Sequence, residues 1–248
     1  MFVDDGGIGE PAVLFIHGLG GNTSQWKAQL EHLRQKRRAL AVDLRGHGRT
    51  ALPGNEVFDI EAMAADVKDL ADSSRLQRFV LAGHSAGESV AIAFSGNDPE
   101  RVLGLFLVDP AGDDRQVPRV EVEPFMAALE SDYQSAIEDY WRELLSHSET
   151  VVQEKVIADL RATPRAAVIG IFRAILTYDP VTPLHRYPGP VLSVITPLNN
   201  APFSLHRLIP DLPHRLITGT GHWPQMDKPD QLNRMIDAFL ERVIRVSR

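Results

Sequence analysis

The sequence predicts an α/β protein in which a mostly parallel central sheet is covered by helices on both faces. Short, continuously apolar runs alternate with longer amphipathic stretches along most of the chain, which is the pattern of strands and helices around a parallel sheet. The chain has 248 residues, of which 44% are hydrophobic, and this suits one α/β core better than two independent domains. One internal stretch, 117–178, contains no convincing strand. This stretch predicts a helical insertion.

The core elements follow in order along the chain. Residues 12–16 (AVLFI) form an apolar run that stops at a His-Gly pair, as expected for a strand buried on both faces. Stretches with apolar residues three or four positions apart are expected to be helices between such strands. The expected strands are 12–16, 38–42, 79–82, 102–108, 191–195 and 215–217, and the expected helices are 24–34, 60–70, 85–94 and 231–243.

The strand-free stretch divides the chain in our prediction. Residues 125–145 carry apolar side chains at helical spacing, and two more helices are expected near 150–160 and 164–178. We therefore predict an α/β core made of residues 1–116 and 179–248, with residues 117–178 as a helical cap over one end of the sheet. The alternative is that these helices pack on a flank of the sheet.

Composition excludes several classes of function. The formal net charge is −7, from 26 Lys and Arg against 33 Asp and Glu, which disfavours binding to nucleic acid or to an anionic membrane. The chain has no cysteine, so disulfides, thiolate metal sites and cysteine nucleophiles are excluded. The N-terminus lacks the basic start of a signal peptide, and no apolar run reaches the roughly 20 residues of a membrane span. We expect a cytoplasmic protein, although a cleaved leader would leave no trace.

The strongest motif is G-x-S-x-G, present as GHSAG at residues 83–87. It lies between an expected strand and an expected helix, where a tight turn needs small residues on both sides of the serine. Such a turn projects the hydroxyl of Ser85 above the sheet and directs the N-terminus of the next helix at it. The alternative is a Gly-Ser turn without chemistry.

With three further motifs the chain resembles an α/β-hydrolase that has a helical cap. HGLGG follows the first apolar strand at residues 17–21, DLRGHG follows the next at residues 43–48, and GTGHW lies near the end at residues 219–223. The resemblance covers essentially the whole chain. It implies that Ser85 is a nucleophile and that the backbone N–H groups of Leu19 and Ala86 form an oxyanion hole. A phosphate-binding loop is disfavoured for HGLGG because the lysine is missing.

His222 is the best candidate among nine histidines for the general base. It lies in the glycine-rich loop between the last expected strand and the closing helix. By resemblance, His17, His47 and His84 occupy structural turn positions, and the other histidines have no partner motif. The chain contains no H-E-x-x-H or H-x-x-E-H spacing, and we predict neither a metal nor a cofactor.

The acid of the triad departs from the common family pattern. Most members carry it after the strand that corresponds to 191–195, but here that strand is followed by Asn199 and Asn200. An amide cannot stabilise an imidazolium electrostatically. We predict that Asp109, which closes the neighbouring strand, supplies the carboxylate. The alternatives are Asp113 or Asp114, or a site without an acid.

Glu88 follows the last glycine of the serine motif, where small residues are usual. In the first turn of a helix its carboxylate would favour the helix dipole, and we predict this capping role. The alternative is that Glu88 supports the catalytic residues.

The sequence therefore predicts a serine carboxylesterase, independent of cofactors, that acts on a small to medium uncharged ester through an acyl-enzyme. Apolar and aromatic residues are expected to line its pocket, or to be plain core. They are Leu19, Trp26, Phe125, Met126, Tyr133, Trp141, Phe172 and Trp223. One alternative is a lactonase or a carbon–carbon bond hydrolase with the same site. Another is a non-catalytic protein that binds small molecules.

Overall fold

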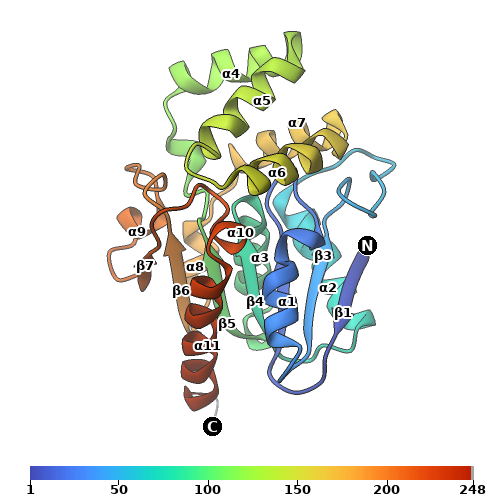
Figure 1. The fold of residues 1–248 in the computed structure, drawn as a ribbon, viewed down its shortest axis with the longest axis vertical. Helices are drawn as coiled ribbons and strands as arrows, with labels where there is room; N and C mark the ends of the chain where they lie inside the picture. The colour runs from blue at the N-terminus through green and yellow to red at the C-terminus, as the bar shows by residue number, and fades with distance from the viewer. Residues whose placement is uncertain (247–248) are drawn as a thin grey trace.

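The computed structural model describes residues 1–246 and contains a seven-stranded sheet in the order β1-β3-β2-β4-β5-β6-β7 (Figure 1). Strands β2 to β7 are parallel to their neighbours, and β1 runs antiparallel to β3 along one edge. The strands are β1 (Phe2–Gly6), β2 (Ala12–Ile16), β3 (Ala39–Asp43), β4 (Phe79–His84), β5 (Val102–Val108), β6 (Val191–Ile195) and β7 (His214–Leu216). This confirms the predicted fold class, and each predicted strand is present with small shifts of its ends.

Strand β1 is the one strand that the sequence did not predict. Its sequence FVDDG lacks a continuous apolar run. Its formation depends on backbone pairing with β3, from Phe2 opposite Asp43 to Gly6 opposite Ala39. An edge strand needs fewer buried side chains than a central one, so its sequence signal is weak.

Two hydrophobic cores lie on the two faces of the sheet. On one face, α2 (Ile60–Ser73), α3 (Ala86–Asn97) and α8 (Val181–Arg186) pack together. On the other face, α1 (Lys27–Leu33) packs against α11 (Pro229–Val246). Every residue of β2, β3 and β4 is buried, because both faces of these strands are covered. Each large aliphatic side chain buried in this way contributes about 1.5–3 kcal/mol.

Four helices are inserted between β5 and β6 and lie across one end of the sheet (Figure 1). They are α4 (Arg119–Ser131), α5 (Tyr133–Leu144), α6 (Thr150–Ala162) and α7 (Arg165–Ile175). The loop after β2 approaches them closely, because a Cβ added at Gly20 would lie 3.0 Å from Leu160 and 3.4 Å from Trp141. The inserted helices therefore cover the carboxyl ends of the strands. The exact division of the chain into core and cap stays a prediction.

The remaining elements are short. Helices α9 (Leu205–Leu208) and α10 (Pro224–Asp227) follow β6 and β7, and 3-10 turns occupy Thr23–Trp26, Pro99–Arg101 and Asp114–Gln116. The helix expected over 24–34 is therefore a 3-10 turn followed by α1. Within residues 1–246, no helix is long and apolar enough to cross a membrane.

Candidate active site

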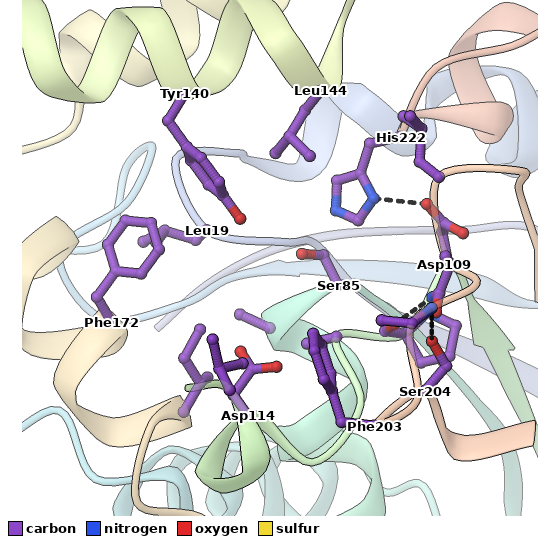
Figure 2. A pocket seen from close by; sticks show the side chains of 18 of the residues that line it. Leu19, Ser85, Asp109, Asp114, Tyr140, Leu144, Phe172, Phe203, Ser204 and His222 are labelled. Carbon is purple, nitrogen blue, oxygen red and sulfur yellow. Dashed lines mark hydrogen bonds and ion pairs between the residues drawn. The ribbon is translucent and has the colours of Figure 1, made fainter. Parts of the chain in front are cut away.

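Ser85 lies at the sharp turn between β4 and α3, with φ 51° and ψ −127°. A positive φ is strained for a residue with a side chain and is held in place only by the surrounding structure. Here the surroundings are backbone. A Cβ at Gly83 would lie 2.5 Å from the carbonyl oxygen of Gly87, and one at Gly87 would lie 2.3 Å from that of His17. The two glycines of the motif are thus required by close approach of the chain, and the turn presents Ser85 to the cavity (Figure 2).

His222 meets the carboxylate of Asp109 at the same edge of the sheet. Its Nδ1 lies 2.6 Å from Oδ2 of Asp109 (Figure 2). The backbone of the histidine is fixed as well, because its N–H donates to the carbonyl of Leu144 at 3.0 Å and its carbonyl accepts from Nε2 of His84 at 2.7 Å. The ring of His222 borders the cavity beside Ser85. Hydrogen bonds between a nucleophile and its base are often long in a free enzyme.

Asp109 is completely buried and held by two donors. The backbone N–H of Thr196 donates to Oδ1 at 2.7 Å, and the Thr196 hydroxyl donates to Oδ2 at 3.0 Å. Its own N–H donates to the carbonyl of Val194 at 2.7 Å, and its φ is 42°. The end of β5 and the neighbouring end of β6 together fix this carboxylate.

The two asparagines after β6 and the alternative acid Asp113 are bonded to groups other than the imidazole of His222. Asn199 donates its amide to the carbonyl of Pro110, and Asn200 accepts from the guanidinium of Arg207 at 2.6 and 3.0 Å. Asp113 is bound by Arg115 at 2.7 and 2.9 Å, and this guanidinium holds the pKa of Asp113 below its usual range.

Two backbone N–H groups beside Ser85 are free to bind an oxyanion. Leu19 and Ala86 both line the cavity, and within residues 1–246 neither N–H donates to another group. The Ala86 N–H opens α3, where no intrahelical partner exists. Gly18 lets the loop approach, because a Cβ there would lie 2.9 Å from Cβ of Ser85.

Buried neutral histidines hold this loop, as the resemblance implied. His17 donates from Nδ1 to the carbonyl of Gly18 at 2.7 Å and accepts the N–H of Leu44 at Nε2. His47 accepts the N–H of Gly20 at 3.1 Å. Burial lowers the pKa of His17 to about 4 and that of His47 to about 3. Both rings are therefore neutral near pH 7, and their hydrogen bonds to backbone groups hold the loop in place.

A cavity of about 450 Å³ opens at Ser85, between the strand ends and the inserted helices (Figure 2). Of the substrate-binding residues expected from the sequence, Phe125, Trp141 and Trp223 line it, together with Leu19 and Phe172. Tyr140, Leu144 and Phe203 also line it, and the sequence analysis did not select them for the pocket. Tyr140 and Leu144 lie one helical turn apart on the same face of α5. Helical spacing could therefore have identified one of them as a wall residue once the other was known to line the cavity.

Three of the residues expected to line the pocket lie outside its wall. Trp26 is fully buried on the opposite face of the sheet, where its ring packs 4.7 Å from that of Phe15. Tyr133 begins α5 and is outside the cavity wall, with the guanidinium of Arg165 5.4 Å from its ring centroid. The cavity faces the later turns of α5, not its first. Met126 is also outside the wall.

Glu88 lies in the first turn of α3, as expected, but it is completely buried. The hydroxyl of Ser89 donates to Oε2 at 3.1 Å, and Oε1 has no partner among the described residues. Burial raises the pKa of Glu88 to about 8. The expectation of a simple cap was incomplete because α3 is central, and no solvent reaches its first turn to hydrate a carboxylate.

Asp227 anchors the loop that carries His222, a role that the sequence analysis missed. Its Oδ2 accepts the hydroxyls of Thr220 and Ser148 at 2.8 Å each and the N–H of Gly221 at 3.2 Å. Ser148 belongs to the segment between α5 and α6, so this one carboxylate joins the inserted segment to the histidine loop. Within residues 1–246, no group of three His, Asp or Glu side chains is arranged to hold a metal ion.

Comparisons of the sequence and of the structure with known proteins agree on one family. A family model described as the alpha/beta hydrolase family matches residues 13–235. The chain is 28% identical over 261 residues to an sn-1-specific diacylglycerol lipase of Mus musculus, covering 95% of this chain and 83% of that protein. It is 26% identical to a thermophilic esterase from Thermogutta terrifontis, with a TM-score of 0.83 and coverage of 98% and 93% of the two chains.

A further relative is longer than this chain. The dihydrolipoyllysine-residue acetyltransferase component of the acetoin cleaving system from Pseudomonas putida is 26% identical over 250 residues. The match includes 96% of this chain but spans only 65% of that protein.

Proposed function

This chain belongs to the alpha/beta hydrolase family, and we propose that it is a serine carboxylesterase for small to medium uncharged esters with an apolar body. The observation that supports this most strongly is the contact of 2.6 Å between Nδ1 of His222 and a buried carboxylate of Asp109, beside a serine held at positive φ. These are the parts of a triad: a nucleophile, a base and a group that orients the base.

In the proposed reaction, Oγ of Ser85 attacks the ester carbonyl while Nε2 of His222 takes the hydroxyl proton. Asp109 holds Nδ1–H and stabilises the imidazolium that forms. The N–H groups of Leu19 and Ala86 donate to the oxyanion of the tetrahedral intermediate. His222 then returns its proton to the leaving alcohol, and an acyl-enzyme remains. Water, deprotonated by His222, attacks this acyl group, and collapse releases the acid and restores Ser85.

We further propose that residues 117–178 form a cap that controls which ester enters. Phe125, Tyr140, Trp141 and Phe172 belong to this segment and line the cavity. The wall they supply suits an acyl or alcohol group with apolar bulk. Helices inserted over an active site commonly control access and exclude water.

The serine mechanism is tested with p-nitrophenyl acetate, butyrate and octanoate, together with labelling by a fluorophosphonate. The purified protein should hydrolyse at least one ester and take up one label, on Ser85. Ser85→Ala should lose the label and several orders of magnitude in turnover while remaining folded.

The matched control is Ser204→Ala, because Ser204 also lines the cavity but has no histidine partner. This variant should keep the label. Undiminished hydrolysis by Ser85→Ala would contradict the proposed nucleophile. Absence of both labelling and hydrolysis in the unmodified protein would favour the alternative of a non-catalytic binding protein.

A further inference from the structure

The cavity has a second carboxylate that the proposed triad does not use. Asp114 begins the 3-10 turn after β5 and lines the cavity, on the side away from Tyr140, Leu144 and His222 (Figure 2). Within residues 1–246, its carboxylate accepts no hydrogen bond and forms no ion pair. A partly buried carboxylate without a partner is costly, so its presence in a substrate cavity calls for a ligand group.

The charges around the cavity are all of one kind. None of its lining residues within 1–246 is a lysine or an arginine, and its acidic members are Asp109, Asp114 and Glu121. Arg115 follows Asp114 in the chain, but its guanidinium is bound to Asp113 at 2.7 Å and to Asp179 at 2.9 Å. Nothing in the wall therefore compensates Asp114, and an anionic substrate would be repelled.

The cavity that contains Asp114 also has a cluster of aromatic rings in its wall. The ring centroids of Phe125 and Tyr140 are 5.0 Å apart, those of Phe125 and Phe172 are 5.2 Å apart, and those of Tyr140 and Phe172 are 5.8 Å apart. Aromatic rings attract alkylammonium groups through their quadrupoles, and they also bury the alkyl part of such groups. A carboxylate and three clustered rings that line one cavity, with no basic residue of 1–246 in its wall, are the chemistry that recognises an alkylammonium cation.

We propose that Asp114 determines specificity by binding an alkylammonium group on the acyl or alcohol part of the ester. This inference rests on the proposed ester hydrolysis and narrows its substrate class. Of two esters with the same shape, the enzyme prefers the one that carries the positive charge. An ester of the same shape that carries a carboxylate is a poor substrate.

The preference depends on pH in a defined direction. Burial, followed by the charge of Asp113, raises the pKa of Asp114 to about 7. The other titratable groups near it are Glu88 on α3 and Tyr140 on α5. Because only the ionised form of Asp114 attracts a cation, the preference for the charged ester increases as the pH rises through about 7.

The test uses butyrylcholine and its uncharged isostere, 3,3-dimethylbutyl butyrate. The measured quantity is the ratio of their kcat/KM values. The unmodified protein should favour butyrylcholine, and Asp114→Asn should lower the ratio about tenfold or more, as expected for loss of a charged partner. The matched control is Glu121→Gln, the other carboxylate of the wall outside the triad. Because Glu121 is solvent-exposed, this variant should keep the ratio within about twofold.

A binding measurement separates this inference from the ester hydrolysis on which it rests. Tetraethylammonium should bind Ser85→Ala, detected by titration calorimetry, and should bind more weakly to the double variant with Asp114→Asn. Hydrolysis of p-nitrophenyl esters with no preference for butyrylcholine, or with a ratio that Asp114→Asn leaves unchanged, would overturn the inference while keeping the esterase. Binding of tetraethylammonium without any ester hydrolysis would overturn the esterase while keeping the cation site.

Discussion

The two sides of the cavity are built in different ways. On the side of the strand ends, backbone groups and buried partners fix the catalytic candidates: Thr196 donates twice to Asp109, and His84 at the end of β4 donates to the carbonyl of His222. On the side of the inserted helices, aromatic side chains form the wall. The difference is the basis of our proposal that the strand ends supply the chemistry and that side chains of the insertion select the substrate.

The largest expected effect comes from removing the charge of Asp109, the carboxylate at the strand ends. Asp109→Asn should lower kcat by about 10² to 10⁴, because the imidazolium of His222 loses its stabilising charge and its tautomer is no longer enforced. Steady-state kinetics with p-nitrophenyl butyrate measure this. Asn199→Ala and Asn200→Ala are the controls, and each should cost much less, since their amides bind Pro110 and Arg207. Equal losses in Asp109→Asn and Asn199→Ala would contradict the assignment of the acid.

A second prediction tests the tight backbone turn that carries Ser85. Gly83→Ala would bring a Cβ to 2.5 Å from the carbonyl oxygen of Gly87, so the turn must shift or unfold. We expect a loss of about 1–3 kcal/mol in the free energy of unfolding, as for other overpacked sites, and loss of fluorophosphonate labelling. Gly54→Ala is the control, because a Cβ there meets nothing within 4 Å, and it should change stability by less than about 0.5 kcal/mol. Urea unfolding compares the two.

The catalytic side could be predicted from sequence largely because its constraints are local or topological. Gly83 is required by a contact within a few residues of Ser85, and Gly87 by the close approach of the loop after β2. Asp109 followed from the rule that neighbouring parallel strands end at one edge, without knowledge of any side-chain contact. Strand β1 escaped prediction because backbone pairing, and not a side-chain pattern, forms it.

The cavity wall was harder to predict because it depends on how helices are rotated against one another. Helical spacing marked both Tyr133 and Trp141 as apolar positions of α5, but only packing decides which turn faces the cavity. Trp26 has the size of a pocket residue and is a core residue of the opposite face. Glu88 was expected in the first turn of a helix, and its complete burial depends on the chain segments that cover α3.

A third prediction concerns Glu88, the buried acid in the first turn of α3. The pKa of Glu88 is about 8 in the folded protein and near 4.5 when unfolded. The folded state therefore holds its proton more tightly, and stability falls as the pH rises from about 4.5 through 8, with a slope of up to about 1.4 kcal/mol per pH unit. Glu88→Gln should flatten this slope between pH 7 and 9, measured by urea unfolding.

Between pH 7 and 9, the dependence of stability on pH reports on the carboxyls and not on the buried histidines. The lowered pKa values of His17 and His47 reduce stability only at acid pH, where the unfolded state takes up protons that the folded state does not. Asp114, whose pKa is also raised, to about 7, contributes in the same direction as Glu88. Asp114→Asn should therefore reduce the slope below about pH 7, where both carboxyls contribute, and keep the part near pH 8. An unchanged slope in Glu88→Gln would contradict the burial of an ionisable carboxyl there.

The smallest expected effect comes from comparing Trp141 with Trp26. The sequence alone could not assign either tryptophan to the cavity wall or to the core. Trp141 lines the cavity and Trp26 does not. Trp141→Phe removes wall area where the substrate sits, so KM for p-nitrophenyl octanoate should rise by about three- to tenfold with little change in kcat, the pattern of lost uniform binding. Trp26→Phe should leave KM unchanged, because its ring packs against Phe15 on the far face, and should instead lower the midpoint of urea unfolding by leaving a cavity in the core. If Trp26→Phe altered the preference among acyl chains as much as Trp141→Phe, the separation between a sheet that sets the chemistry and an insertion that sets the substrate would fail.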